Sequence, residues 1–511
     1  MLSTIFGKKS DHPLADLKSA QALLDDLPKN DAFKSLAEMS DLVELLQVNT
    51  EFKLDHRFAM LRLLDETAQP HLRKLVREYF TPFEISKFQE NRLWLLLSKW
   101  SDQIATAYFR VYTEYCNGEK GSSVIKAQVP LLTVRTVHAL MWKLKYICAR
   151  YGLIDGALWV NLLQLYKHAE QYQYLDTPIS LYSGVAGSTS VKHELGHLMV
   201  WYDAGLSALS PVYIHLTERI AAQYESTIDI QPNQYSRLCF DLNRPAEPTR
   251  VNAGATTYPS MRFVGMPEMK SRLEDLMKVL NKNIVPNEIN LGGSYEAGVI
   301  KEAAQYLLNY VIAPPVRRNA RRTADVTLSV VNGFDKVIQS ADAWLGFDKA
   351  ESVQWITEEI SAGGFSCKIP VKGSDSIGIG SLLGMQPEGV PHWGVAVVRR
   401  LLRDDTDQLR VGAEILSSQV ASVVLNQNRV AGGAIENGQP ALWLYARQND
   451  STGEAQLLLR ADTFSPARSL QTHLSGKNYL LMPSELLEKG LDYDLAKFRF
   501  VVQETGSPEE G

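Results

Sequence analysis

The spacing of apolar residues changes within this chain, and that change limits the fold more than any single motif does. From about residue 33 to 225, apolar side chains recur at steps of three and four, which is the period of an amphipathic helix. After Pro314-Pro315 they alternate with polar residues in short runs that end at Asp, Asn or Gly, a pattern typical of β-strands. Because 511 residues exceed what one hydrophobic core usually serves, we expect a multidomain α+β protein with an all-helical N-terminal half.

Four consecutive segments follow from this change of period. We expect residues 1–227 to form a helical domain, either a bundle or a TPR-like array, and residues 228–312 to form a mixed connecting region with helices. Residues 313–425 are expected to form a small antiparallel β-barrel. Residues 426–511 are expected to form a second β-rich domain or an extension of that barrel.

One long helix is expected in the helical half. Pro82 suits the first turn of a helix, and apolar residues recur at helical spacing after it. Asn117-Gly118 supplies a stop signal. The sequence therefore predicts one long buried helix between these residues.

Charge and cysteine content narrow the classes of function. The net charge of −5 gives no general attraction to nucleic acid or to membranes, so any anion site must be local. The four cysteines lie far apart without a C-x-x-C pair, which favours a reducing compartment. No window approaches the roughly 18 apolar residues of a spanning helix, and the N-terminal segment lacks the apolar core of a secretory signal. We therefore expect a cytoplasmic protein with no membrane span and no nucleic-acid polymer as partner.

The stretch His193-Glu194-Leu195-Gly196-His197 matches the H-E-x-x-H pattern of zinc peptidases. On a helix the two histidines would share one face and bind Zn²⁺, with Glu194 as general base on a bound water. Glu218 lies 21 positions beyond His197, where a third ligand would be needed. Against this hypothesis, Lys192 places a cation beside the site, and the preceding 150 residues have a helical pattern instead of strands. A zinc-dependent hydrolase is therefore one alternative function.

The other interpretation of this stretch is a structural helix. Its buried stripe would consist of Leu195, Leu198, Met199 and Trp201, with both histidines on a polar flank. We favour this interpretation, and we expect no catalytic residue, no metal ligand and no enzymatic activity.

A cluster of arginines follows the double proline. Four guanidinium groups lie within six residues, directly before a predicted strand: Arg317, Arg318, Arg321 and Arg322. Guanidinium forks bind phosphate oxygens with two hydrogen bonds and also match the edge of guanine. About forty residues later a strand ends at Ile360, and residues 361–364 form a turn of small residues that lets a ligand approach the backbone.

Together these pieces resemble the PilZ domain, the bacterial receptor module for cyclic di-GMP. That family carries R-x-x-x-R on the segment leading into a small β-barrel and D/N-x-S-x-x-G on the barrel surface. Either pair of arginines four residues apart fits the first motif, and residues 359–364 fit the second except at Glu359. The resemblance covers about residues 315–425 and extends to the "GVAVVRR" and "VGAEIL" strands.

The resemblance implies a bacterial signalling effector that binds cyclic di-GMP as a regulatory ligand and needs no cofactor. The arginines would grip the phosphates and guanines of the ligand. On the barrel side it implies a contact at Glu359, a hydroxyl contact at Ser361 and a turn of close approach at Gly364. The helical half, in which we recognise no family, would be a protein-interaction region that transmits the signal to a partner.

Two points stay open in this interpretation. Glu359 is one methylene longer than the Asp or Asn of the family, so an alternative is a PilZ-like scaffold that no longer binds nucleotide and acts through protein contacts. In addition, residues 333–351 look inserted between the two motifs, and this insertion would either cover the site or lengthen a strand connection.

Overall fold

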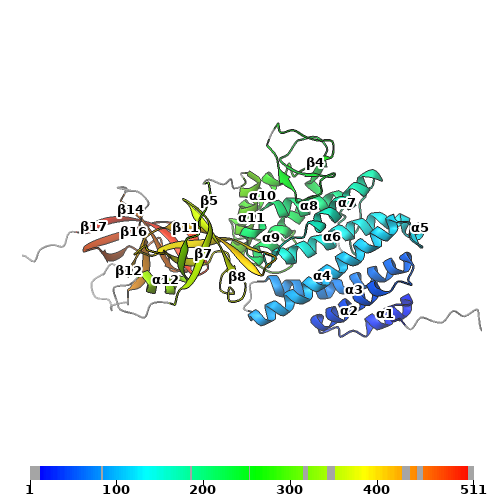
Figure 1. The fold of residues 1–511 in the computed structure, drawn as a ribbon, viewed down its shortest axis with the longest axis horizontal. Coiled ribbons are helices and arrows are strands. Elements are labelled where there is room, and N and C mark those ends of the chain that lie inside the picture. Colours follow the sequence, from blue (N-terminus) through cyan, green and yellow to red (C-terminus); the bar gives the residue numbers. More distant parts are fainter. Residues whose placement is uncertain are drawn as a thin grey trace, which may run out of the picture. The chain divides into compact units, whose positions relative to one another are not determined.

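The protein divides into two compact units, Met1–Pro315 and Val316–Gly511. The structure is a computed structural model, and it describes the chain in these ranges: 12–81, 85–184, 187–252, 254–312, 314, 320–341, 351–427, 438–445 and 453–503. Helices dominate the first unit and strands the second (Figure 1). The predicted multidomain α+β class, with a helical N-terminal half followed by β-barrels, is therefore confirmed.

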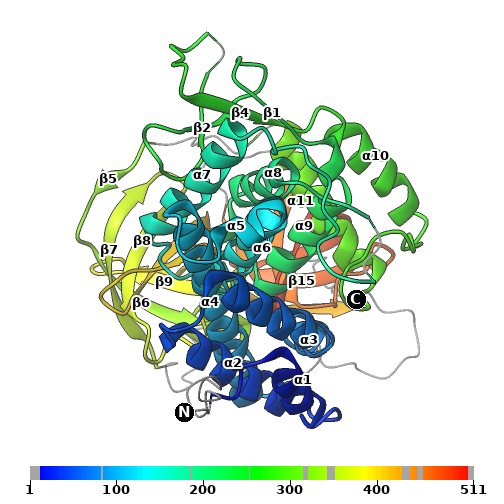
Figure 2. The ribbon, with the colours of Figure 1, turned by 90° about the vertical axis from the view of Figure 1, so that its right-hand side faces the viewer.

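The first unit is an array of helices around one hydrophobic core. Figure 2 shows α2, α3 and α4 lying side by side, and α4 also packs against α6. Apolar residues at helical spacing from every long helix enter this core. The three- and four-residue spacing of apolar residues in the sequence therefore predicted these helices. The helices are α1 (Leu17–Asp25), α2 (Ala32–Val48), α3 (Leu54–Phe80), α4 (Lys87–Cys116), α5 (Ser122–Ile125), α6 (Val129–Cys148), α7 (Gly156–Gln171), α8 (Val191–Asp203), α9 (Pro211–Gln223), α10 (Met269–Leu280) and α11 (Ala297–Ile312).

The predicted long helix is α4, and it starts later than expected. The helix begins at Lys87, after the N-cap residue Ser86, whose hydroxyl accepts a hydrogen bond from the amide of Gln89. The Gln89 side chain accepts one from the Ser86 amide in return, which completes a capping box. Pro82 lies outside the described residues. The helix ends at Cys116, and Gly118 follows with a φ of 73°, as the Asn-Gly stop signal predicted.

A small antiparallel sheet interrupts the helices of the first unit. Its strand order is β1-β4-β2-β3. It packs against α8, the helix that carries the H-E-x-x-H stretch. The strands are β1 (Asp229–Gln231), β2 (Leu238–Asp241), β3 (Thr249–Arg250) and β4 (Met261–Gly265).

The second unit begins with an antiparallel barrel. Its order is β5-β7-β6-β9-β10-β11-β8, and pairing of β7 with β8 closes it, so that β5 is an edge strand added to β7. The strands are β5 (Arg322–Thr323), β6 (Thr327–Asn332), β7 (Val353–Ser361), β8 (Gly364–Pro370), β9 (Leu382–Pro387), β10 (Gly394–Arg403) and β11 (Gln408–Ser417).

The remaining strands form a second closed barrel of order β12-β13-β14-β17-β16-β15. The C-terminal segment is therefore a separate barrel, which β12 begins at Val420. The strands are β12 (Val420–Gln427), β13 (Gln439–Leu444), β14 (Glu454–Arg460), β15 (Leu470–Leu474), β16 (Lys477–Lys489) and β17 (Tyr493–Gln503).

The two barrels share a hydrophobic core. Helix α12 (Phe334–Ala341), part of the inserted segment, contributes Phe334 and Val337 to this core. Side chains of β9 and β10 from the first barrel meet side chains of β13, β14 and β17 from the second. The Arg399 guanidinium adds two hydrogen bonds to the Glu488 carboxylate, at 2.7 and 2.6 Å. The described part of the insertion therefore joins the barrels.

Candidate functional site

The structure brings the arginine segment to the second PilZ-like motif. Strand β5 pairs antiparallel with β7, so that Arg322 lies opposite Ile360 and Thr323 lies opposite Glu359. Arg317 and Arg318 lie outside the described residues. Arg321 and Arg322, the described arginines of the first motif, therefore meet the second motif at one edge of the first barrel, although about forty residues separate them in the sequence.

Arg321 pairs with Glu359, the residue at which the second motif departs from the family pattern. Its Nη1 atom donates a hydrogen bond of 2.5 Å to Oε2 of Glu359. The side chains are 33% and 43% exposed, so water screens this ion pair, and such pairs contribute about 0–1 kcal/mol to stability. A guanidinium carries five N–H donors, so Arg321 can still bind another anion. Arg322 is exposed and forms no ion pair within the described residues.

The strand that carries Glu359 is irregular. The register of β7 against β8 shifts between Thr357 and Glu359, which is a β-bulge at Glu358. The Glu358 carboxylate accepts contacts from Lys368 at 3.3 Å and from Arg410 at 3.0 Å. Glu359 and Ser361 are two residues apart and so share one face of β7 beyond this bulge. Bulges often occur next to functional sites because they change the direction of a side chain.

Ser361 and Gly364 close the hairpin between β7 and β8. The Ser361 hydroxyl donates a hydrogen bond of 3.2 Å to the carbonyl of Gly364, which leaves its oxygen lone pairs available to a ligand. A Cβ atom at Gly364 would lie 2.3 Å from the carbonyl oxygen of Ala413 on β11. The close approach that the structure shows at Gly364 is therefore to the barrel's own backbone.

The H-E-x-x-H stretch lies in the first unit, on α8. Leu195, Leu198, Met199 and Trp201 are fully buried, which confirms the predicted apolar stripe. The prediction that both histidines lie on a polar flank is wrong for His197, whose side chain is 2% exposed. The ring of His197 faces α9, where its Nε2 atom lies 3.1 Å from the carbonyl oxygen of Glu218. At the neighbouring Gly196, a Cβ atom would lie 2.4 Å from Cγ2 of Ile228, so the glycine lets α8 pack closely against that residue.

Glu218, the predicted third zinc ligand, is bound by a lysine instead. Its carboxylate accepts a hydrogen bond of 2.5 Å from Nζ of Lys145, and the two side chains are 1% and 0% exposed. His197 donates from Nε2 to the backbone carbonyl of Glu218 at 3.1 Å. Within the described residues, His, Cys, Asp and Glu side chains form no group of three that could hold a metal ion. The ammonium of Lys145 therefore supplies the positive charge that stabilises the ionised carboxylate of Glu218 inside the protein.

A half-buried carboxylate, that of Glu225, lies on the other side of His197. Oε2 of Glu225 is 3.8 Å from Nδ1 of His197. Burial, together with the charge of Glu194, raises the pKa of Glu225 to about 8, although the nearby Thr189 hydroxyl acts in the opposite direction. The folded state therefore keeps a proton on Glu225 at pH values where an exposed carboxyl group has lost it.

The substitution Glu225→Gln is expected to remove a pH dependence of stability. Between 4.5, the ordinary pKa of a glutamate, and about 8, the folded state binds more protons than the unfolded state. The contribution of Glu225 to the unfolding free energy is thus complete below this window and falls as pH rises through it. Relative to the unaltered protein, the unfolding free energy of the variant should rise by about 1 kcal/mol or more from pH 5 to pH 8. Urea unfolding at the two pH values measures this change. A stability difference that is the same at both pH values would contradict this assignment.

Comparisons with known proteins add one finding. Residues 18–234 match a family model described as "Cyclic-di-GMP receptor FimW, N-terminal domain". No curated protein and no solved structure matches the chain. The match extends from α1 to β1 and its flanking loop, so it covers the helical half, whose sequence pattern indicated no family. The PilZ resemblance lies outside the matched residues and stays a prediction.

The structure also bears on membrane insertion. Within the described ranges, each helix is either too short or too polar to cross a bilayer.

Proposed function

We propose that this protein is a non-enzymatic cyclic di-GMP receptor whose first barrel binds the nucleotide in the manner of a PilZ domain. The observation that carries the proposal is the pairing of β5 with β7, which sets Arg321 and Arg322 beside Glu359 and Ser361. The similarity of residues 18–234 to the N-terminal domain of a cyclic di-GMP receptor supports the same ligand independently, because those residues lie in the other unit.

Each residue of the proposed site has a role that follows from its chemistry. Cyclic di-GMP carries two phosphodiester anions and two guanines, which guanidinium groups bind through forked hydrogen bonds and by stacking. We assign this role to the clamp, defined as Arg317, Arg318, Arg321 and Arg322. The Ser361 hydroxyl would hydrogen-bond the ligand from the barrel side, and Gly364 would hold the hairpin against β11.

Glu359 has a double role in this proposal. It would hydrogen-bond a guanine edge, as the Asp or Asn of the family does, but in the ligand-free state it binds Arg321. A phosphate that approaches Arg321 must therefore share the guanidinium with a carboxylate of like charge. We infer that this competition weakens binding without preventing it.

The substitution Glu359→Asp is expected to tighten cyclic di-GMP binding by about tenfold, which corresponds to one hydrogen bond regained. The shorter carboxylate matches the family pattern and reaches less far toward Arg321. Isothermal titration calorimetry of the full chain measures the change. Glu414→Asp is the matched control, because Glu414 is an exposed carboxylate on β11 that pairs with Arg399. An affinity that is unchanged or weaker in Glu359→Asp would contradict the role given to Glu359.

The Arg321–Glu359 pair also favours a second candidate function. If Glu359 neutralises the clamp completely, the barrel is a PilZ-like scaffold that acts through protein contacts. The two functions differ in one outcome. The scaffold function predicts that both the unaltered protein and Glu359→Asp, although folded, give no saturable signal with cyclic di-GMP.

We propose that the signal passes to the helical unit through the segment around Pro314-Pro315. The clamp follows these prolines directly, and α11 ends just before them at Ile312. Binding of a ligand by the clamp would therefore constrain the connection between the two units. The helical unit would then present a changed surface to a protein partner in the cytoplasm.

Trypsin provides a test of ligand binding by the clamp, since it cleaves after arginine and the clamp contains four arginines. Saturating cyclic di-GMP is expected to slow cleavage between residues 317 and 322 by about tenfold or more, because binding reduces the population of open states. GTP at the same concentration is the control ligand. Mass spectrometry of the fragments measures the rate of cleavage. A rate at this segment that cyclic di-GMP leaves unchanged would argue against binding of the ligand by the clamp.

A further inference from the structure

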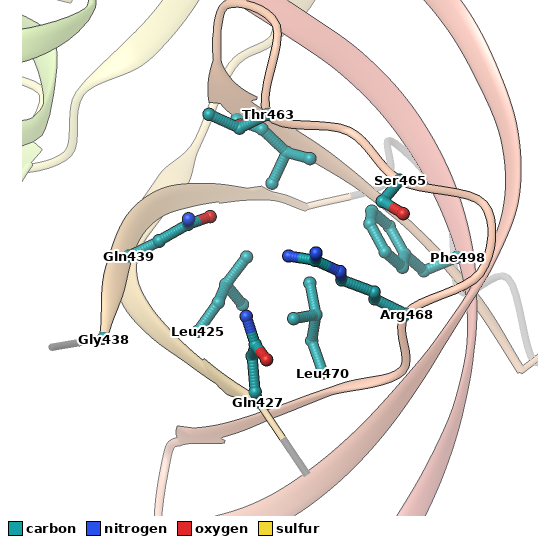
Figure 3. Close-up of a pocket in the computed structure, with 10 residues that line it drawn as sticks. Leu425, Gln427, Gly438, Gln439, Thr463, Ser465, Arg468, Leu470 and Phe498 are labelled. Atoms are coloured by element: carbon teal, nitrogen blue, oxygen red, sulfur yellow. The ribbon is translucent and has the colours of Figure 1, made fainter. Parts of the chain in front are cut away.

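One end of the second barrel contains a cavity of about 200 Å³. It lies where β12 ends and β13 begins, and the loop between β14 and β15 borders it. Its floor consists of apolar side chains from four strands, and its rim is polar (Figure 3). The floor residues are Leu425, Leu459, Leu470 and Phe498, and the polar rim residues are Gln427, Gln439, Thr463, Ser465 and Arg468.

The floor belongs to the core of the barrel. Leu425, Leu459 and Phe498 are 3%, 5% and 1% exposed and belong to one buried cluster inside the barrel. A ligand group that reaches this floor would therefore contact side chains that the barrel already holds in place. An apolar group is favoured there because it leaves water without losing hydrogen bonds.

The rim is built on a fixed loop. The buried carboxylate of Asp494 accepts hydrogen bonds from the amides of Thr463 and Phe464, both at 3.1 Å. The Thr463 hydroxyl donates to the carbonyl of Arg460 at 2.6 Å. These bonds hold the start of the loop that carries Arg468.

Arg468 is the only charged side chain among the described residues that line the cavity. Figure 3 shows its guanidinium directed across the cavity toward Leu425, above Leu470 in this view. The acidic residues nearest to it along the loop and strand are already engaged, because Asp462 pairs with Lys489 at 3.1 Å and Asp494 accepts the loop amides. Within the described residues, Arg468 forms no ion pair. A guanidinium placed above an apolar floor without a carboxylate partner is suited to bind an anion from solution.

We propose that this cavity binds a small amphiphilic anion, namely a carboxylate that carries a short apolar chain. The carboxylate would accept hydrogen bonds from Arg468, with Gln427, Gln439 and the Ser465 hydroxyl as further donors, and the chain would lie on the apolar floor. The cavity volume is about 200 Å³, so the enclosed part of the ligand is small. This site lies in the second barrel, goes beyond the proposed nucleotide site and does not depend on it.

The test is a ligand-observed NMR titration of the full chain with hexanoate, whose chain fits the enclosed volume. Hexanoate is expected to bind saturably, and hexanamide, a neutral molecule of the same length, to bind at least about tenfold more weakly, because charge-assisted hydrogen bonds are lost. Arg468→Gln should weaken hexanoate binding by a similar factor. Arg468 is exposed, so the variant is expected to fold.

Arg499→Gln is the matched control variant. Arg499 is exposed on β17 next to Phe498, and because successive side chains of a strand point to opposite faces, it points away from the cavity. Its hexanoate affinity should equal that of the unaltered protein. Equal weakening of hexanoate binding in Arg468→Gln and Arg499→Gln would overturn the proposal. The absence of saturable hexanoate binding would also overturn it, even if the dipeptide N-acetyl-Gly-Leu binds. Cyclic di-GMP titration of Arg468→Gln separates the two sites, since nucleotide binding should be unchanged.

Discussion

The double substitution Arg317→Ala and Arg321→Ala is expected to reduce the affinity for cyclic di-GMP by at least about a hundredfold, because each lost charge-assisted contact is worth about 1.5–3 kcal/mol. The two residues fit the R-x-x-x-R pattern, and Arg321 lies on the barrel edge beside Glu359. The loss should be larger than that of either single variant, since both guanidinium groups serve one ligand. Calorimetric titration of the full chain measures it.

The control removes two arginines elsewhere on the same unit. Arg460 and Arg499 are exposed residues of the second barrel, and replacing both with alanine changes the net charge by the same amount. This control variant should bind cyclic di-GMP with unaltered affinity. Equal weakening in both double variants would show that net charge attracts the ligand, and the assignment of the clamp would be wrong.

The second large effect concerns stability of the helical unit. Lys145→Met is expected to lower its free energy of unfolding by about 3–5 kcal/mol, because the substitution leaves a buried carboxylate without its partner. Burial opposes the ionisation of Glu218, but the charges of Lys145 and Arg219 hold the pKa of Glu218 well below its ordinary value. Methionine fills a similar volume, so the change isolates the charge. Far-ultraviolet circular dichroism during denaturant unfolding follows the helices.

Lys143→Met on the same helix is the matched control. Lys143 pairs with Asp102 at 2.6 Å, but the two side chains are 31% and 56% exposed. Pairs of this kind contribute about 0–1 kcal/mol, so the control should unfold close to the unaltered protein. A Lys145→Met variant that is as stable as the control would show that Glu218 does not depend on the lysine.

The change of apolar period was sufficient to predict the order of helices and barrels, because one side of each element faces a core. The core shared by the two barrels could not be predicted in the same way. On β13, Ala441 and Trp443 face the inside of the second barrel, whereas Leu442 and Leu444 enter the shared core. A continuous apolar run such as "ALWL" is the signal of a strand buried on both faces. The shared core also means that a fragment ending at residue 425 would expose apolar surface of the first barrel.

The residues of the candidate site could be predicted from the sequence, but the contacts between them could not. The two motifs gave the arginines and Glu359, but the Arg321–Glu359 pair depends on the register of β5 against β7. A shift of one residue would turn Arg321 to the other face, and short edge strands carry little sequence information about register. The burial of His197 was missed for a related reason, since it depends on contact with Glu218 on α9, which is 21 residues away in the sequence.

The most direct measurement is a calorimetric titration of the full-length protein with cyclic di-GMP at high protein concentration. The proposed function predicts saturable heat and a dissociation constant in about the micromolar range, which corresponds to about −8 kcal/mol. Saturable heat with this nucleotide, and none with GTP, is the result that the proposal requires. The absence of saturable heat from the folded protein would contradict the proposal that it is a cyclic di-GMP receptor.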